Sequence, residues 1–399
     1  MRILLINSEF PYPPRAANSL IPFHLLQEWQ GRHQISFYCL ALDPPAPEHY
    51  DLIANLCNEL QVFPHKFNNS GWARFKHVFS SKPHGVNLFH NKAMLEAVIT
   101  NATLEHFDVL IALCINTVQY AIAVAEGLPT IATPLDAVSL LYSRRIERER
   151  NPLKRLYLGW QHRRISCYER ENYCRLGAAV MASEKDREVI AGECPHLPLY
   201  VAPLGVDVNP GALPRPATQF IMTANFGYAP NKDAALWLLR EIWQNIRREL
   251  PQARLRLAGR GMDDELWSFD GRDGIEIAGE VPSIRDELAA ATVALNPMRF
   301  GSGMRLKALE AFAAGTPLVS TRLGVEGLPV RDGEEALLAD DAAGFAHAVV
   351  RLAGDLDLQQ RLREGGLALV AKGYSWENYA KVVEEAIEEA VKNFKEKTG

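Results

Sequence analysis

Residues 295–310 read LNPMRFGSGMRLKALE, and this stretch decides the fold of the second half of the chain. A short apolar segment ends at Asn296, a loop with two glycines follows, and a helix begins near Gly303. Glycines in such a loop let backbone N–H groups approach an anion, and the positive end of the helix dipole favours negative charge. The stretch predicts a strand–loop–helix unit of an open parallel sheet, which binds ligands at the carboxyl ends of its strands.

Helical geometry places Gly303, Lys307 and Glu310 on one face of this helix, beside an apolar flank. Glu310 is followed by the apolar run 311–315, so its carboxylate needs a polar partner inside a mostly buried helix. A nucleotide sugar would offer a diphosphate to Lys307 and ribose hydroxyls to Glu310. The alternative is a Lys–Glu pair at spacing i,i+3 with a glycine that only caps the turn.

The same alternation of strands and helices extends in both directions from this stretch. It predicts an α/β fold with two doubly wound parallel sheets. A polar helical region is expected over 139–175, an amphipathic helix over 231–250 and a terminal helix over 375–395. The expected strands cover 2–7, 35–40, 109–113, 130–133, 179–182, 199–202, 220–223, 255–258, 275–278, 293–296, 317–320 and 336–338.

The chain has 399 residues, more than one hydrophobic core normally supports, and a turn-rich segment lies near its middle. Residues 209–216 contain three prolines and one glycine, which is typical of a linker. We therefore predict one domain over 1–208 and a second over 209–374, followed by a terminal helix over 375–399.

Composition limits the classes of function. The net charge of −5 argues against a nucleic-acid binder, which needs a positive surplus. The six cysteines form no C-x-x-C pair, so unpaired thiols and a reducing compartment are expected. The opening apolar run is too short for a signal peptide, and polar residues interrupt the most apolar window, 110–128. A cytoplasmic location, or one at the inner face of the membrane, is the resulting prediction.

Four segments together resemble one protein family. LEAFAAGTPLVST at 309–321 resembles the L-E-A-M-A-x-G-x-P-V-V signature of retaining family 4 glycosyltransferases of the GT-B fold. FPYPP at 10–14 and APLGVD at 202–207 resemble the first loop and the P-N-G-V-D hinge motif. Residues 225–234 resemble the opening of the donor domain. The matches occur in the right order over nearly the whole chain.

This resemblance implies two Rossmann-like domains that face a central cleft, with the acceptor bound by the N-terminal domain (1–208) and the donor by the C-terminal domain (209–374). It also implies that the C-terminal helix crosses back to the N-terminal domain. It implies a retaining, metal-independent, hexosyltransferase-like enzyme of polysaccharide or glycoconjugate biosynthesis. The donor would be a UDP-, GDP- or TDP-sugar with no separate cofactor. The acceptor would be a hydroxyl of a glycan, a lipid-linked molecule or a small molecule.

The candidate site residues follow from the motif and the strand ends. Lys307 and Arg305 are expected to stabilise the leaving diphosphate, and Glu310 to bind the donor ribose. Asp136 would contact the acceptor, although it could equally cap the following helix. The other donor-side candidates are Gly301, Ser302, Gly303, Met304, Asn225 and Gly279, and the other acceptor-side candidates are Asn18 and Asn116.

The chain departs from the family pattern at several positions. Ser302 stands where the first glutamate of the E-x7-E motif is expected, and Ala17 replaces a glycine of the first loop. Residues 112–116 contain no histidine, and the usual Arg and Lys of the first donor-domain loop are not evident. These features resemble an exopolysaccharide-associated subfamily with a G-x-x-x-K-x-x-E loop. The alternative is a catalytically degenerate GT-B protein that acts as a binding or partner subunit.

Residues 144–175 contain ten Arg or Lys and four acidic side chains, interleaved with large apolar residues. One interpretation is peripheral contact with an anionic membrane that delivers a lipid-linked acceptor. The other is a solvated long helix with ion pairs such as Arg145–Glu149. The interleaved apolar residues are Leu153, Leu156, Tyr157, Leu158 and Trp160.

Overall fold

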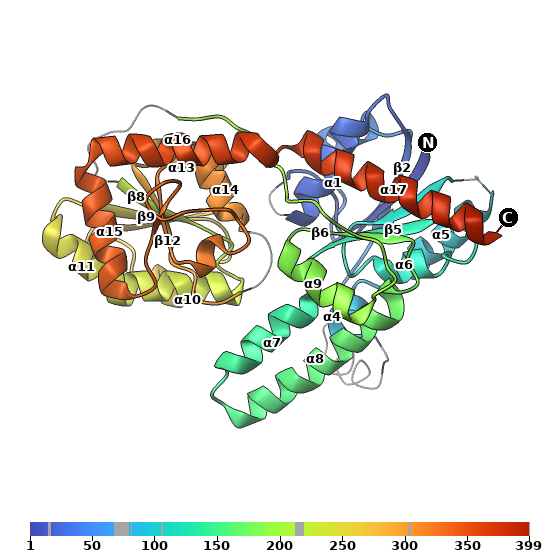
Figure 1. Cartoon of the computed structure of the whole chain (residues 1–399), viewed down its shortest axis with the longest axis horizontal. Helices are drawn as coiled ribbons and strands as arrows, with labels where there is room; N and C mark the ends of the chain where they lie inside the picture. Colours follow the sequence, from blue (N-terminus) through green and yellow to red (C-terminus); the bar gives the residue numbers. More distant parts are fainter. Residues whose placement is uncertain are drawn as a thin grey trace. The chain divides into compact units, whose positions relative to one another are not determined.

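A computed structural model describes residues 1–14, 17–67, 80, 82–104, 107–211, 219–301 and 305–398, which form two compact units (Figure 1). Among the described residues, unit 1 contains 1–204 and 376–398, and unit 2 contains 205–301 and 305–375. The chain thus passes into unit 2 a few residues before the division expected after residue 208. Part of the expected linker, residues 212–216, lies outside the described residues.

Unit 1 is built on a seven-stranded sheet in which every strand pair is parallel, in the order β3-β2-β1-β4-β5-β6-β7. The central strands are almost completely buried because helices cover both faces, which explains their continuous apolar sequences. The strands are β1 (Arg2–Asn7), β2 (Gln34–Ala41), β3 (Glu59–Pro64), β4 (Val109–Ala112), β5 (Thr130–Leu135), β6 (Ala178–Met181) and β7 (Leu199–Val201).

The C-terminal helix α17 (Trp376–Thr398) belongs to unit 1, as the family resemblance implied. His24 stacks on Trp376 at 4.1 Å between ring centroids, and Glu384 pairs with Arg32 at 2.9 Å. The other helices in the described part of unit 1 are α1 (Ala17–Trp29), α2 (Pro47–Ala54), α4 (His84–Leu88), α5 (Lys92–Leu104), α6 (Val118–Ile122), α7 (Val138–Arg148), α8 (Pro152–Tyr173) and α9 (Glu184–Glu193).

Unit 2 contains a second parallel sheet, of six strands in the order β10-β9-β8-β11-β12-β13. Its apolar core joins the sheet to the surrounding helices through residues such as Phe220, Trp243 and Phe345. Two parallel α/β units agree with the expected fold class. The strands are β8 (Gln219–Thr223), β9 (Arg254–Ala258), β10 (Ile275–Gly279), β11 (Val293–Asn296), β12 (Leu318–Ser320) and β13 (Leu337–Leu338).

The helix expected over 231–250 contains a π-helical segment, η1 (Leu238–Ile242), between α10 (Ala229–Trp237) and α11 (Trp243–Glu249). A π-turn adds one residue to a helical turn and so shifts the faces that α10 and α11 present to the core. The remaining helices are α12 (Asp264–Trp267), α13 (Ile284–Ala290), α14 (Leu306–Ala313), η2 (Leu323–Val325), α15 (Ala342–Gly354) and α16 (Leu356–Gly373).

Two elements of unit 1 differ from the sequence prediction. The edge strand β3 was not predicted, because its half-buried, partly polar sequence lacks the apolar run of an inner strand. The single helix expected over 139–175 is a hairpin of two helices, α7 and α8. Asn151 caps α8 by accepting hydrogen bonds from the amides of Leu153 (3.0 Å) and Lys154 (3.2 Å), and Pro152 occupies the first helical position.

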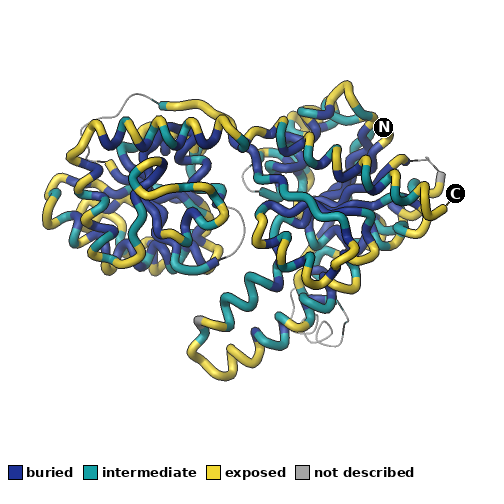
Figure 2. Tube along the Cα trace, in the orientation of Figure 1, coloured by how far each residue is buried: buried dark blue, intermediate teal, exposed yellow. Residues whose placement is uncertain are grey.

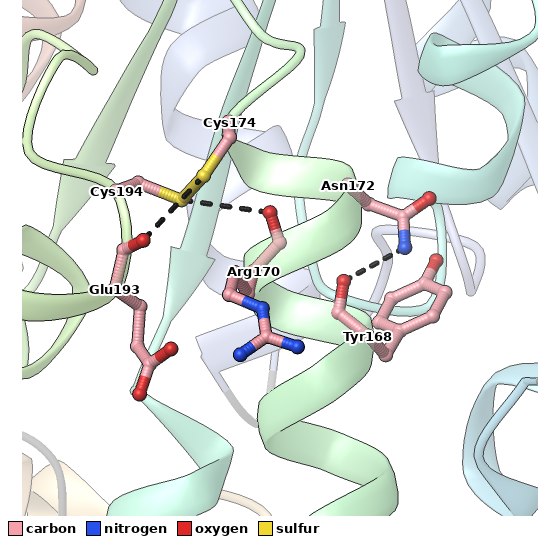
Figure 3. The surroundings of a disulfide bond; sticks show 6 residues. All are labelled: Tyr168, Arg170, Asn172, Cys174, Glu193 and Cys194. Carbon is pink, nitrogen blue, oxygen red and sulfur yellow. Dashed lines mark hydrogen bonds between the residues drawn. A yellow bond between two sulfur atoms is a disulfide. The ribbon is translucent and has the colours of Figure 1, made fainter.

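A disulfide joins Cys174, at the end of α8, to Cys194, at the end of α9, with the two Cα atoms 5.3 Å apart (Figure 3). This pair corrects the expectation of unpaired thiols and removes the argument for a reducing compartment. In the described chain, Cys39, Cys57, Cys114 and Cys167 are free. The two cysteines of the disulfide are 20 residues apart in the sequence, and closing a loop of this length contributes about 3 kcal/mol of stability in the chain-entropy model.

None of the described helices has both the length and the apolar composition that a membrane span requires.

Candidate functional site

The strand order of unit 2 brings the donor-side candidates to one edge of the sheet. All six strands are parallel, so the loops after β8, β10 and β11 leave the same edge. Asn225 follows β8, Gly279 ends β10 and Gly301 follows β11. Ser302, Gly303 and Met304 lie outside the described residues.

Helix α14 carries the two central candidates on an otherwise apolar helix. Leu309 and Phe312 are buried in the unit, whereas Lys307 and Glu310 are half-buried. Neither side chain forms a hydrogen bond or ion pair with the described residues, and they do not pair with each other. The alternative of a simple Lys–Glu pair is therefore not what the structure contains.

The electrostatic surroundings of these two side chains favour their neutral forms. Burial lowers the pKa of Lys307 to about 8, although the nearby Glu310 carboxylate opposes this shift. Burial likewise raises the pKa of Glu310 to about 7, against the influence of Lys307. A charged group in a partly buried position is unfavourable when it has no hydrogen-bonding partner. A ligand with complementary groups would therefore stabilise the charged forms of both Lys307 and Glu310.

Arg305 is committed to the structure of unit 2 rather than left free for a ligand. Its side chain is only 2% exposed and forms an ion pair with Glu326 at 2.9 Å. The guanidinium also donates to the backbone oxygen of Leu323 at 2.8 Å and to that of Gly301 at 3.4 Å. These contacts lock the start of α14 to the loop after β12. We therefore correct the expectation that Arg305 contributes to binding a diphosphate.

Sequence analysis missed Arg260, which lies at the same edge in the loop after β9. Gly259 has φ +140°, and a Cβ there would lie 1.8 Å from the oxygen of Ala224, so only glycine fits. A Cβ at Gly261 would likewise lie 2.5 Å from the backbone nitrogen of Gly227. The Arg260 side chain is exposed and has no ion pair within the described part of the chain. The Gly-Arg-Gly sequence directly after a strand was the available signal.

The acceptor-side candidates of unit 1 also share one sheet edge. Asn18, Asn116 and Asp136 follow β1, β4 and β5, which are adjacent parallel strands. The buried Asn7 side chain donates hydrogen bonds to the backbone oxygens of Glu9 (2.7 Å) and Asn18 (2.8 Å), so it ties the start of α1 to the end of β1.

Carboxylates from two other helices accept hydrogen bonds from backbone amides at the start of α7. Asp186 accepts a hydrogen bond from the amide of Ala137 at 2.9 Å, and Glu169 accepts one from the amide of Ser139 at 3.2 Å. Asp136 is half-buried beside these residues and has contacts of its own. Acceptor contact by Asp136 and helix capping by Asp136 both stay predictions.

Glu169 should make the stability of unit 1 depend on pH. Burial raises its pKa to about 7 against the hydrogen bonds from Ser139, so the folded state keeps a proton that the unfolded state releases above pH about 4.5. Stability therefore falls as the pH rises from 4.5 to 7. Between pH 5 and pH 8, the unfolding free energy of Glu169→Gln should decrease by about 2 to 3 kcal/mol less than that of the unaltered chain. Denaturant titrations at the two pH values measure this difference.

The matched control for this experiment is Glu188→Gln, because Glu188 is an exposed carboxylate on α9. It should keep the pH dependence of the unaltered chain. Equal pH dependence in Glu169→Gln and Glu188→Gln would contradict the assignment to Glu169.

Two cavities lie away from the carboxyl edges of the two sheets, where the candidate residues are. In unit 2, a cavity of about 640 Å³ is lined by the first residues of the strands, including Gln219, Arg254 and Ile275, at the opposite edge from the candidate site. In unit 1, a cavity of about 820 Å³ is lined by α5, α6 and the end of α8. Neither cavity contains a site residue predicted from the sequence.

Residues 217–355 match the family model for glycosyl transferases group 1, a segment that includes β8 to β13 and the whole of α14. The C-terminal unit carries a group 1 glycosyltransferase domain. A D-inositol 3-phosphate glycosyltransferase from Streptomyces bingchenggensis is 32% identical over 146 residues, 35% of this chain and 32% of that protein. The chain spans less than half the length of the curated relatives it matches.

Solved structures extend the likeness in fold to both units. Sucrose-phosphate synthase from Thermosynechococcus elongatus superimposes with a TM-score of 0.70 at 15% identity, over 98% of this chain and 99% of that chain. HepE from Anabaena in complex with UDP gives a TM-score of 0.64 at 13% identity, over 97% and 100% of the respective chains. The chain therefore has a GT-B-type fold with two Rossmann-like units, and the transferase domain forms the second.

Proposed function

We propose that this chain is a glycosyltransferase that moves a sugar from a nucleotide diphosphate sugar to a hydroxyl acceptor. The observation that carries the proposal is the pair Lys307 and Glu310, which share one face of α14 in the transferase domain and bind no other described side chain. A nucleotide diphosphate has the complementary groups, because its phosphates are anionic and its ribose carries hydroxyls.

In this proposal, Lys307 and the backbone of the loop before α14 bind the diphosphate and stabilise the charge that develops as it leaves. Glu310 accepts hydrogen bonds from the ribose hydroxyls. Arg260, exposed at the same edge, supplies the second positive charge that the sequence had assigned to Arg305. Asn225, Gly279 and Gly301 form the surrounding wall of the donor site.

The acceptor would bind at the carboxyl edge of the unit 1 sheet, near Asn18, Asn116 and Asp136. Its class is a glycan, a lipid-linked molecule or a small hydroxyl compound, in polysaccharide or glycoconjugate biosynthesis. Retention of configuration and independence of metal ions follow from the family resemblance and are part of the proposal. The donor base is uracil, guanine or thymine, and the UDP complex of HepE supports testing UDP first.

Calorimetric titration of the full chain with UDP, GDP and TDP in the presence of EDTA tests this proposal. One of them should bind, and Glu310→Ala should weaken its binding by about 10- to 100-fold, because the ribose loses hydrogen bonds to a charged acceptor. The control is Lys232→Ala, which removes an ion-paired cation of α10 from the same unit. If none of the three binds, the proposal is wrong.

A screen for donor hydrolysis and transfer over common nucleotide sugars then tests turnover. Release of the nucleotide diphosphate with one donor supports the enzyme and identifies the sugar. Binding without turnover across donors and acceptors would contradict the enzyme and support a non-catalytic binding subunit.

A further inference from the structure

The tip of the α7–α8 hairpin exposes the three most accessible large apolar side chains of the described residues. Leu153 is 77% exposed, Leu156 74% and Tyr157 57%. Their spacing of i, i+3 and i+4 places them on one face of α8. The hairpin projects from unit 1, and its tip is the exposed end of both helices (Figures 1 and 2).

Positive charge surrounds this apolar face. Residues 144–164 contain eight Arg or Lys and two Glu, although the whole chain has a net charge of −5. Lys154, Arg155 and Arg163 are exposed on α8 and form no ion pair with any residue the structure describes. The tip therefore combines unshielded apolar surface with unneutralised cations.

An aromatic and cationic series continues along the same face toward the base of the hairpin. The rings of Tyr157 and Trp160 lie 6.0 Å apart between centroids, and the Arg164 guanidinium lies 4.7 Å from the centre of the Trp160 ring. Arg164 also donates to the backbone oxygen of Lys82 at 2.5 Å. The middle of α8 is thereby tied to the segment that precedes α4, which holds the apolar face of the helix in place.

We propose that the tip of the α7–α8 hairpin docks on a membrane surface that contains anionic lipids. Leu153 and Leu156 enter the boundary between headgroups and acyl chains, Tyr157 and Trp160 lie at the headgroup level, and the flanking cations contact lipid phosphates. A second copy of the chain is a poor occupant, because docking two tips would bring together two strongly positive segments. This inference concerns a surface of unit 1 and does not depend on sugar transfer.

Co-sedimentation of the full chain with phosphatidylcholine vesicles, with and without 30 mol% phosphatidylglycerol, tests the docking. We expect binding to the anionic vesicles that weakens as the salt concentration rises from 0.1 to 0.5 M, because salt screens the cations. Equal binding to both kinds of vesicle, or no binding to either, would overturn the proposal.

Two variants and a control localise the contact. The double substitution Leu153→Ser and Leu156→Ser should weaken vesicle binding on the order of tenfold, because it removes the apolar insertion. Lys154→Gln with Arg155→Gln should weaken it by about fivefold for each charge removed. Leu42→Ser changes an apolar side chain of unit 1 that is 55% exposed elsewhere, and it should bind like the unaltered chain.

Circular dichroism should show that all these variants keep the helical content of the unaltered chain. Undiminished vesicle binding by the folded double leucine variant would overturn the proposal. So would a dimer in sedimentation analysis that depends on Leu153 and Leu156 and forms without lipid, since a second copy would then cover this face. Tighter binding to a nucleic-acid duplex than to anionic vesicles would also overturn it.

Discussion

Replacing Lys307 with alanine is expected to lower the kcat of sugar transfer by about 10²- to 10³-fold. The bond to the sugar breaks as negative charge accumulates on the leaving diphosphate, and Lys307 is the cation on α14 that no described carboxylate neutralises. Arg305 cannot replace it, because its guanidinium is buried against Glu326 and two backbone oxygens.

The same substitution should leave unit 2 as stable as before, or more stable. Burial lowers the pKa of Lys307 to about 8, which means that its surroundings disfavour the charged form. Removing the ammonium therefore relieves an unfavourable interaction in the unliganded protein. Loss of activity without loss of stability is the pattern expected of a residue retained for function.

Steady-state assays of nucleotide diphosphate release, combined with thermal melts, measure both effects. Lys232→Ala is the control, because Lys232 lies on α10 of the same unit and is ion-paired with Asp263 and Glu265. A kcat for Lys307→Ala close to that of Lys232→Ala would remove Lys307 from the catalytic mechanism.

Replacing Arg305 with alanine should instead destabilise unit 2 by about 3 kcal/mol. Truncation leaves the backbone oxygens of Leu323 and Gly301 and the carboxylate of Glu326 without their donor, and it opens a void at the start of α14. For a unit of this size, the melting temperature should fall by about 6 to 12 °C. Nucleotide binding should weaken as well, because the loop and α14 lose their anchor.

Thermal melts and denaturant titrations followed by tryptophan fluorescence measure this loss, since Trp237, Trp243 and Trp267 belong to unit 2. The control is Arg322→Ala, which removes a guanidinium that is 64% exposed and paired with Asp340 at the surface. It should have a much smaller effect, because solvent screens that pair. Equal losses from the two variants would show that the Arg305 contacts do not hold α14 in place.

Local sequence patterns predicted the inner strands of both sheets. They also predicted that Lys307 and Glu310 lie on the same face of a helix. An inner parallel strand is buried on both faces, so it must be apolar along its length, and that signal is readable without a structure. Among the described strands, β3 pairs only with β2; it lies at the edge of the sheet and is half-buried, so it carries no such signal. The turn between α7 and α8 was readable from Asn151 and Pro152, but the polar run around it resembled one continuous helix.

The sequence by itself determined two parallel α/β units and a cation and a carboxylate on one face of α14. These properties depend on periodicity and spacing within short segments. Only the tertiary structure decided that Glu326 neutralises Arg305, that Cys174 meets Cys194, and that no described residue of unit 1 covers Leu153 and Leu156 at the tip of the α7–α8 hairpin. Each of these depends on which distant segments pack together, and side-chain partners across such distances are not encoded in any local pattern.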